Sequence, residues 1–255
     1  MTDRPHGAPG FRAPRLSDLA ASIRLGLQDF AATPLISLYF AAYFVAAGLG
    51  MAWVTYVTAQ TFWLILAVLG FPLIGVFAAF GLYEISRRRS QGRPVRFVEI
   101  QRLVWSERGG QVPWLAVIVV VILLFWFFLG HMIFALFLGL SPMTHVSTSL
   151  TVFWSPEGLA MVGFGSAIGA GFAVLIFAAS VLAVPMLLER DVDFMTAMAT
   201  SMGQVIAHPA IYLLWGAIIA ILTFIAMVPA FLGLFLAMPV LGHATWHLYA
   251  RLSAD

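Results

Sequence analysis

The chain has 255 residues, of which 62% are hydrophobic and only 9% charged, and its mean hydropathy is +0.99. These values exclude an ordinary soluble domain and indicate an integral membrane protein that crosses the bilayer several times. The net charge of +2 comes from 13 arginines in short segments between apolar runs, which indicates membrane topology rather than nucleic-acid binding, and the lack of cysteine excludes disulfides and thiolate sites.

The N-terminal segment carries charges and glycines and has no apolar stretch of the kind found in signal peptides. We therefore expect residues 1–15 to be a flexible cytoplasmic terminus and the first membrane helix to direct insertion. A single membrane domain is expected over residues 16–251, followed by a short tail at 252–255.

Six apolar runs are long enough to cross a bilayer, which takes about 20 residues as a helix. They are residues 35–58, 60–83, 114–139, 158–187, 210–227 and 229–248. Only Met227–Pro229 separates the last two, but one uninterrupted helix there would be close to 60 Å long, about twice the hydrocarbon thickness. The sequence therefore predicts an all-α polytopic membrane protein with six transmembrane helices arranged as three hairpins.

The arginines orient these helices, because all 13 fall in the segments that lie on one side of the predicted membrane. The opposite loops hold only one charged residue, Glu157. Positively charged loops are cytoplasmic in membrane proteins. The sequence thus predicts cytoplasmic N- and C-termini and insertion in a bacterial inner membrane.

A short amphipathic segment precedes each odd-numbered membrane helix and ends at Pro34, Pro113 or Pro209. The first segment places Leu16 and Leu27 on one helical face. Each segment is expected to form a cytoplasmic helix in the membrane interface, with the proline marking the start of the next helix. The pattern indicates three repeats, 16–90, 96–190 and 194–251, which arise either by duplication or as a common solution to the same boundary problem.

Ionisable residues gather at the predicted cytoplasmic helix ends, where they form a candidate polar cluster: Glu84, Glu189, Arg190, His243 and His247. Histidines four residues apart share a helix face and could bind a metal, with a glutamate as third ligand. The alternative is an interfacial belt in which the histidines have no common target and Glu84 pairs with Arg88.

Intrinsic haem is disfavoured because two histidines would have to lie at the same membrane depth on different helices. His131 falls about 25 Å into an outward-running helix, whereas His243 lies about 12 Å from the cytoplasmic end of the last helix. His131 is instead expected to face the bundle and form a hydrogen bond there. No cofactor is predicted, and bound lipids are expected.

The fourth predicted helix is rich in small residues, namely Gly163, Gly165, Gly169 and Gly171. Small residues let helix backbones approach closely, either within the chain or against a partner. No G-x-S-x-G, P-loop or paired-carboxylate pattern is present, which disfavours an enzyme.

Four stretches of the chain are distinctive: "GLQDFAATP", "GFPLIGVFAAFGLYEISRR", "LAVPMLLERDVDFMTAMATS" and "MPVLGHATWHLYAR". Together they resemble a bacterial family of predicted integral membrane proteins of unknown function. Some members of that family carry the label putative cytochrome c oxidase protein. The resemblance implies an association with respiratory membranes and no established activity.

The function expected from these features is that of a non-catalytic inner-membrane protein. It would be an accessory, assembly or interaction subunit of a larger respiratory or photosynthetic membrane complex, with lipids and another membrane complex as partners and no nucleic acid. The alternative is a small-solute or metal-ion carrier whose polar site is the cytoplasmic cluster.

Overall fold

The computed structural model describes residues 4–58, 64–139 and 153–254. The elements in chain order are β1 (Gly10–Phe11), α1 (Leu16–Ala32), α2 (Pro34–Thr58), α3 (Leu64–Ser90), α4 (Phe97–Ser106), the 3-10 turn η2 (Glu107–Gly109), α5 (Val112–Leu138), α6 (Pro156–Ser180), α7 (Ala183–Glu189), α8 (Phe194–Ala207), α9 (Pro209–Met227), α10 (Leu234–Leu252) and β2 (Ser253–Ala254). Helices form nearly all of this structure, so the predicted all-α class is confirmed.

In the described part of the chain, four helical segments are long and apolar enough to cross a membrane: Pro34–Thr58, Val112–Leu138, Pro156–Glu189 and Pro209–Met227. The predicted second and sixth membrane helices correspond to α3 and α10, which are not among these four. In α10 the polar residues His243, His247 and Arg251 occupy the C-terminal half. The chain is an integral membrane protein with several apolar helices, and the number six stays a prediction.

Prolines mark the starts of the long helices, as their chemistry requires, since a proline has no N–H to donate inside a helix. Helix α2 begins at Pro34 and α9 at Pro209, and Pro113 is the second residue of α5. The short helices α1 and α8 come directly before α2 and α9, and α4 precedes α5 with only η2 between them.

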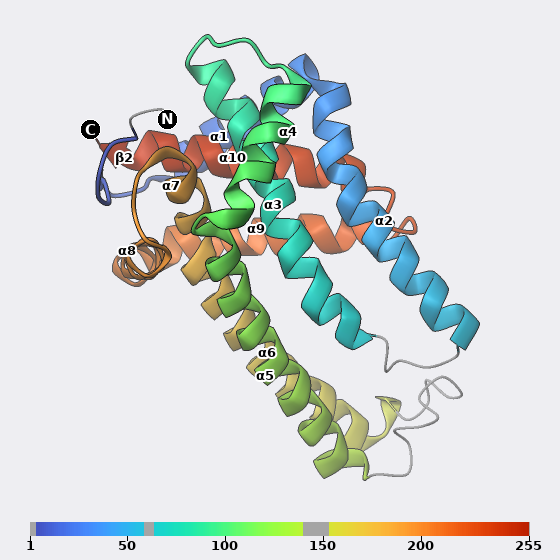
Figure 1. Cartoon of the computed structure of the whole chain (residues 1–255). Helices are drawn as coiled ribbons and strands as arrows, with labels where there is room; N and C mark the ends of the chain where they lie inside the picture. Colours follow the sequence, from blue (N-terminus) through green and yellow to red (C-terminus); the bar gives the residue numbers. More distant parts are fainter. Residues whose placement is uncertain (1–3, 59–63, 140–152, 255) are drawn as a thin grey trace.

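Consecutive long helices pack as pairs, α2 on α3, α5 on α6 and α9 on α10. The α5–α6 pair extends away from the other helices, whereas α9 and α10 run across the direction of α3 (Figure 1). Beyond Val119 the buried residue of α5 is Ile133, and before Ala178 those of α6 are Gly158 and Met161. The outer halves of this pair are therefore largely exposed.

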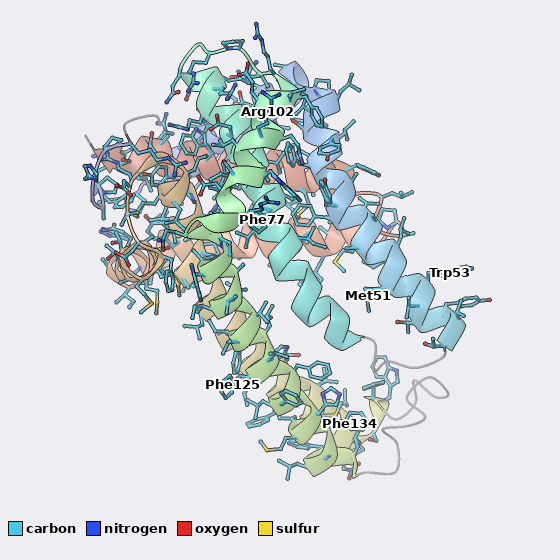
Figure 2. The ribbon with its side chains drawn as sticks, viewed as in Figure 1. Met51, Trp53, Phe77, Arg102, Phe125 and Phe134 are labelled. Atoms are coloured by element: carbon cyan, nitrogen blue, oxygen red, sulfur yellow. The ribbon has the colours of Figure 1, made fainter. Side chains whose placement is uncertain are left out.

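Large apolar side chains cover the outside of the long helices, as expected where lipid replaces water. Figure 2 shows Trp53 beyond the far side of α2 and Phe125 on the outer side of α5. Both side chains are about two-thirds exposed, at 67% and 68%.

Helix α1 turns its polar face inward. Asp18, Ser22 and Asp29 are buried against the rest of the structure, and α10 is the main neighbour of α1. Leu16 and Leu27, on the predicted apolar face, are exposed, whereas Leu19 on the same face is buried. Exposed leucines beside a buried polar face suit a helix whose outer side meets the membrane.

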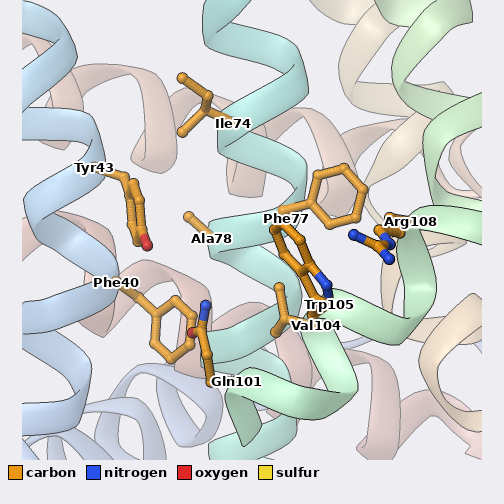
Figure 3. A pocket seen from close by; sticks show the side chains of 9 residues that line it. All are labelled: Phe40, Tyr43, Ile74, Phe77, Ala78, Gln101, Val104, Trp105 and Arg108. Atoms are coloured by element: carbon orange, nitrogen blue, oxygen red, sulfur yellow. The ribbon is translucent and has the colours of Figure 1, made fainter.

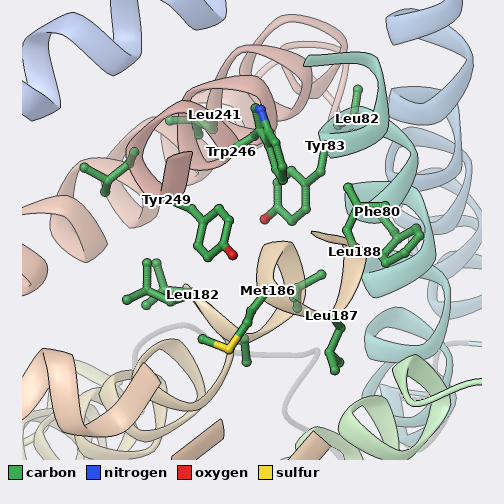
Figure 4. Close-up of a cluster of buried hydrophobic side chains, with 14 of the residues drawn as sticks. Phe80, Leu82, Tyr83, Leu182, Met186, Leu187, Leu188, Leu241, Trp246 and Tyr249 are labelled. Atoms are coloured by element: carbon green, nitrogen blue, oxygen red, sulfur yellow. The ribbon is translucent and has the colours of Figure 1, made fainter. Parts of the chain in front are cut away.

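The hydrophobic core lies where α3, α7 and α10 meet (Figure 4). Phe80 and Leu82 enter it from α3, Met186 from α7, and Trp246 and Tyr249 from α10, and none of these side chains is more than 1% exposed. The short α7 is buried along most of its length because it lies inside this junction.

The two termini lie together. Strands β1 and β2 are antiparallel, with Gly10 opposite Ala254 and Phe11 opposite Ser253. Farther upstream, Arg4 donates to the carbonyl of Leu187 at 3.1 Å. Residues 4–12 of the expected N-terminal segment thus have defined neighbours at the ends of α7 and α10.

Candidate functional site

A buried polar network connects the last helix with the first three. Its members come from four elements: Asp29 of α1, Ser37 of α2, Ser86 and Arg89 of α3, and His243 and His247 of α10. Helix α1 runs along α10, which brings its buried polar face to the two histidines.

His243 is fully buried and hydrogen-bonded through both ring nitrogens. Its Nδ1 lies 3.1 Å from the carbonyl oxygen of Leu82 and 2.8 Å from Ser86 Oγ. A carbonyl oxygen only accepts, so Nδ1 carries the proton and Nε2 accepts from the Ser37 hydroxyl at 2.9 Å. The contacts therefore select one tautomer of a neutral imidazole.

The second histidine pairs with a carboxylate. His247 Nε2 lies 2.7 Å from Asp29 Oδ2, and Arg89 Nε donates to Asp29 Oδ1 at 2.7 Å. Ser86 also forms a hydrogen bond with Asp29. Since Ser86 accepts from His243 as well, one chain of hydrogen bonds runs from Ser37 to His247.

The Asp29 carboxylate stays ionised inside this network. Burial raises its pKa, but hydrogen bonds from His247, Ser86 and Arg89 favour the charged form and bring the pKa to about 2. Because an ionised carboxylate only accepts hydrogen bonds, His247 Nε2 is the donor in their contact.

A second cluster lies at the N-terminal end of α1, where two arginines contact Asp18. Arg12 donates to both carboxylate oxygens, at 2.6 and 2.9 Å, and Arg251 Nη2 lies 3.3 Å from Oδ1. The Arg12 hydrogen bonds lower the pKa of Asp18 to about 2 despite its burial. This cluster joins the segment before α1 to the end of α10.

Glu84 belongs to a different set of ion pairs. Its carboxylate contacts Arg87 at 3.1 Å and Arg88 at 2.6 Å, and Arg88 also contacts Glu99 of α4. The pairing of Glu84 with Arg88, one of the two alternatives from the sequence, is thus present. Glu84 thus pairs within α3, Arg88 links α3 to α4, and these ion pairs of Glu84 involve neither histidine.

Glu189 and Arg190 lie at the end of α7 and affect a different residue of α10. The charges of both residues act on Tyr249, whose hydroxyl is buried. The five residues of the candidate polar cluster are therefore divided between three places: the network around Asp29, the α3–α4 contact and the end of α7.

Metal binding by the two histidines finds little geometric support. His247 is engaged by Asp29 and His243 by two serines and a carbonyl. Among the residues described, no group of three or more histidine, aspartate and glutamate side chains is placed to hold a metal ion.

The expected bundle-facing position of His131 is wrong. The side chain is exposed on α5, and Nδ1 donates to the carbonyl of Phe127 in the same helix at 2.7 Å. The two residues are four positions apart, so the hydrogen bond of His131 Nδ1 is made within its own helix.

The four glycines of α6 face two directions. A Cβ on Gly169 would lie 2.9 Å from the Trp126 ring of α5, and one on Gly165 would lie 3.9 Å from Ile133. Gly163 and Gly171 face outward, where no described atom lies within 4 Å of such a Cβ. The first two let α5 approach, and the other two belong to an open face.

The network connects helices and, in the described part of the chain, does not present a reactive group to a substrate. A serine hydroxyl bonded to an imidazole can act as a nucleophile in an enzyme. Ser37 and His243 are both fully buried, however, and each hydrogen-bonding atom of the pair is occupied by protein. A substrate has no route to that hydroxyl among the described residues, and the network ties α1, α2, α3 and α10 together.

Asp18, Asp29, Ser37 and Ser86 were not predicted from the sequence to belong to either cluster. A signal for two of them was available, since Asp18, Ser22 and Asp29 share one face of α1 opposite its leucines. Polar residues sharing a face of a membrane-associated helix indicate burial against protein.

Comparison with known proteins finds a protein family that matches part of the chain. Residues 63–189 match the family described as "Predicted integral membrane protein (DUF2189)". No curated protein and no solved structure matches the chain. The matched segment runs from the start of α3 to the end of α7 and includes Ser86, Arg89 and the glycines of α6. Through this segment the chain belongs to that family of integral membrane proteins.

Proposed function

We propose that the protein is a non-catalytic inner-membrane protein that binds another integral membrane protein, as an accessory, assembly or interaction subunit of a larger complex. The α5–α6 pair supplies the contact. The buried network of α1, α2, α3 and α10 holds the remaining helices rigid on the cytoplasmic side.

The observation that carries this proposal is the outward face of α6. Exposed small residues follow one another at helical spacing along it, namely Ala160, Gly163, Ala167, Ala170 and Gly171. In membranes, such faces allow a second helix to approach closely, and the gain comes from packing because lipid is as apolar as the side chains. The face lies on the pair that extends away from the bundle (Figure 1).

The topology supports the cytoplasmic placement of the network. The arginines all lie on one side of the predicted spans, and the pairing of β1 with β2 puts both termini at the same end of the molecule. Asp18, Asp29 and their arginine partners are at this end, where charges need not cross the hydrocarbon region.

The same geometry favours an interaction protein over a carrier. A transport site needs polar groups that are free to coordinate a solute. Here the polar atoms of His243 and the carboxylates of Asp18 and Asp29 are engaged by protein groups.

Site-directed cross-linking in native membranes tests the proposal. The chain contains no cysteine, so Ala170→Cys carries a single thiol on the outward face of α6. A thiol-anchored photo-cross-linker at this position is expected to give one discrete product whose mass is that of the chain plus a different membrane polypeptide.

The matched control is Ile221→Cys on α9, whose side chain is also exposed on a membrane helix, at 58%. It is expected to give mainly lipid adducts. Equal products from both positions, products from neither, or a product at twice the mass of the chain would contradict the proposal.

A further inference from the structure

A cavity of about 360 Å³ lies between α2, α3 and α4 (Figure 3). Four aromatic side chains line it: Phe40 and Tyr43 from α2, Phe77 from α3 and Trp105 from α4. Its volume is at the lower end of the range for small-molecule sites, roughly 300–1,000 Å³. An apolar group of modest size fits such a space.

Two polar groups mark the α4 side of the cavity. Arg108 lies over the Trp105 ring, with its guanidinium carbon 4.4 Å from the ring centroid. No carboxylate of the described residues lies within 4.0 Å of Arg108, whereas its neighbour Glu107 is paired with Arg4 at 2.5 Å. The guanidinium is therefore held in place by the indole and available to an anion.

The other polar group is the amide of Gln101. Its Oε1 is buried and lacks a hydrogen-bond partner in the described part of the structure. In Figure 3 the Gln101 side chain points into the cavity from α4, beside Phe40. A ligand with a hydrogen-bonding group near its polar end would satisfy this amide.

The position of α4 determines which molecules meet the cavity. The helix follows the arginine-rich segment after α3, and the membrane-length helix α5 begins at Val112, only four residues after Arg108. Exposed aromatic side chains such as Trp105 are typical of the membrane interface. The cavity therefore opens at the level of lipid headgroups on the arginine-rich side.

We propose that this cavity is a binding site for one anionic phospholipid. An acyl chain lies between Phe40, Ile74 and Phe77, and the phosphate lies at Arg108, with Gln101 Oε1 accepting a hydrogen bond from a hydroxyl of the headgroup. A neutral amphiphile would fill the apolar space but leave the Arg108 charge without a counterion. Anionic lipids are concentrated in the cytoplasmic leaflet, where they attract basic residues near membrane helices.

Native mass spectrometry of the full chain, purified in detergent and freed of lipid, tests this site. The probes are phosphatidylglycerol and phosphatidylcholine with identical acyl chains. One phosphatidylglycerol is expected to bind the wild type about fivefold more tightly than phosphatidylcholine, the factor expected for one arginine at an anionic surface. Arg108→Gln is expected to abolish this preference, and glycerol phosphate without acyl chains is expected not to compete.

Arg93→Gln is the matched control, because Arg93 is an exposed arginine in the same cytoplasmic segment that does not line the cavity. It is expected to bind as the wild type does. Equal affinity of the wild type for both lipids, an unchanged preference in Arg108→Gln, or an equal loss in Arg93→Gln would overturn the proposal.

The acyl chain is located separately with brominated phosphatidylglycerol, which quenches tryptophan fluorescence. The quenching is expected to be smaller in Trp105→Phe than in the wild type by the contribution of one tryptophan. Equal quenching in both would place the lipid elsewhere. Trp105 is exposed, at 62%, so this substitution leaves the core intact.

Discussion

His247 Nε2 lies 2.7 Å from Asp29 Oδ2 although 218 residues separate them in the chain. The contact joins the first helix to the last, and both side chains are buried. Because Arg89 of α3 binds the same carboxylate, Asp29 connects the three helices α1, α3 and α10. Substitutions at Asp29 therefore test how much this network contributes to the stability of the fold.

Asp29→Ala is expected to lower the free energy of unfolding by about 3 kcal/mol, because it removes the carboxylate that the buried His247 and the partly exposed Arg89 both contact. The measurement is thermal or denaturant unfolding in detergent micelles. Gln28→Ala, at an exposed position next to Asp29, is the control and is expected to change stability by less than about 0.5 kcal/mol. Equal effects of the two variants would show that the network does not stabilise the fold.

Stability is expected to depend on acid pH through the two aspartates of α1. Their pKa values in the folded protein are about 2, below the ordinary value of 3.8. A carboxylate with a lowered pKa contributes stability above its unfolded pKa and loses it as the pH falls toward the folded value. Unfolding midpoints should thus be level down to about pH 4 and fall between about pH 4 and 2.

The matched comparison for this pH dependence is Asp29→Asn, which removes one of the two titrating groups. Its unfolding midpoint is expected to be lower at neutral pH and to change less between about pH 4 and 2 than that of the wild type. An identical acid profile in both proteins would contradict the assignment of this dependence to Asp29.

His243 and Ser37 are expected to be energetically coupled. Each loses its 2.9 Å partner when the other becomes alanine, so the double variant should be less destabilised than the sum of the singles by about 1 kcal/mol. Pairing His243→Ala with Gln28→Ala should give additive changes. Additivity in the His243–Ser37 cycle would mean that the hydrogen bond contributes nothing.

Close packing of α1 on α10 is tested by comparing a glycine-to-alanine substitution at the contact with the same substitution elsewhere. In Gly26→Ala the new Cβ would lie 2.7 Å from the Val240 carbonyl oxygen and 2.8 Å from the Ala244 nitrogen, so the two backbones must separate. A loss of about 1–3 kcal/mol is expected. Gly203→Ala in α8 meets no described atom within 4 Å and should stabilise by about 0.5–1 kcal/mol. Similar changes at both would contradict the close approach.

The sequence predicts the helices well because apolar length and prolines are local signals. The expected run 210–227 corresponds to α9, Pro209–Met227, and 114–139 to α5, Val112–Leu138. The fourth expected run, 158–187, is divided in the structure into α6 and α7. Helix α7 is short and lies in the core between α3 and α10, a position that hydropathy alone does not reveal.

The polar contacts could be predicted only in part. The pair of Glu84 and Arg88 follows from helical spacing within α3. The partners of His243 and His247 come from α1, α2 and α3, and their choice depends on how α10 crosses these helices. Hydrophobic periodicity gives no crossing angle, so the sequence directed attention to Glu84 and Glu189 instead of Asp29.

We propose that the outward face of α6 binds a partner, whereas the buried network only supports the fold. The most direct measurement is the mass of the particle extracted from native membranes in mild detergent. The wild-type particle is expected to be much larger than the single chain of 27.8 kDa with its detergent. Ala170→Phe is expected to migrate at the mass of the single chain and to unfold as the wild type does. The control Ile221→Phe is expected to migrate as the wild type does. A wild type that migrates as a single chain, or an Ala170→Phe particle as large as the wild type, would contradict the claim.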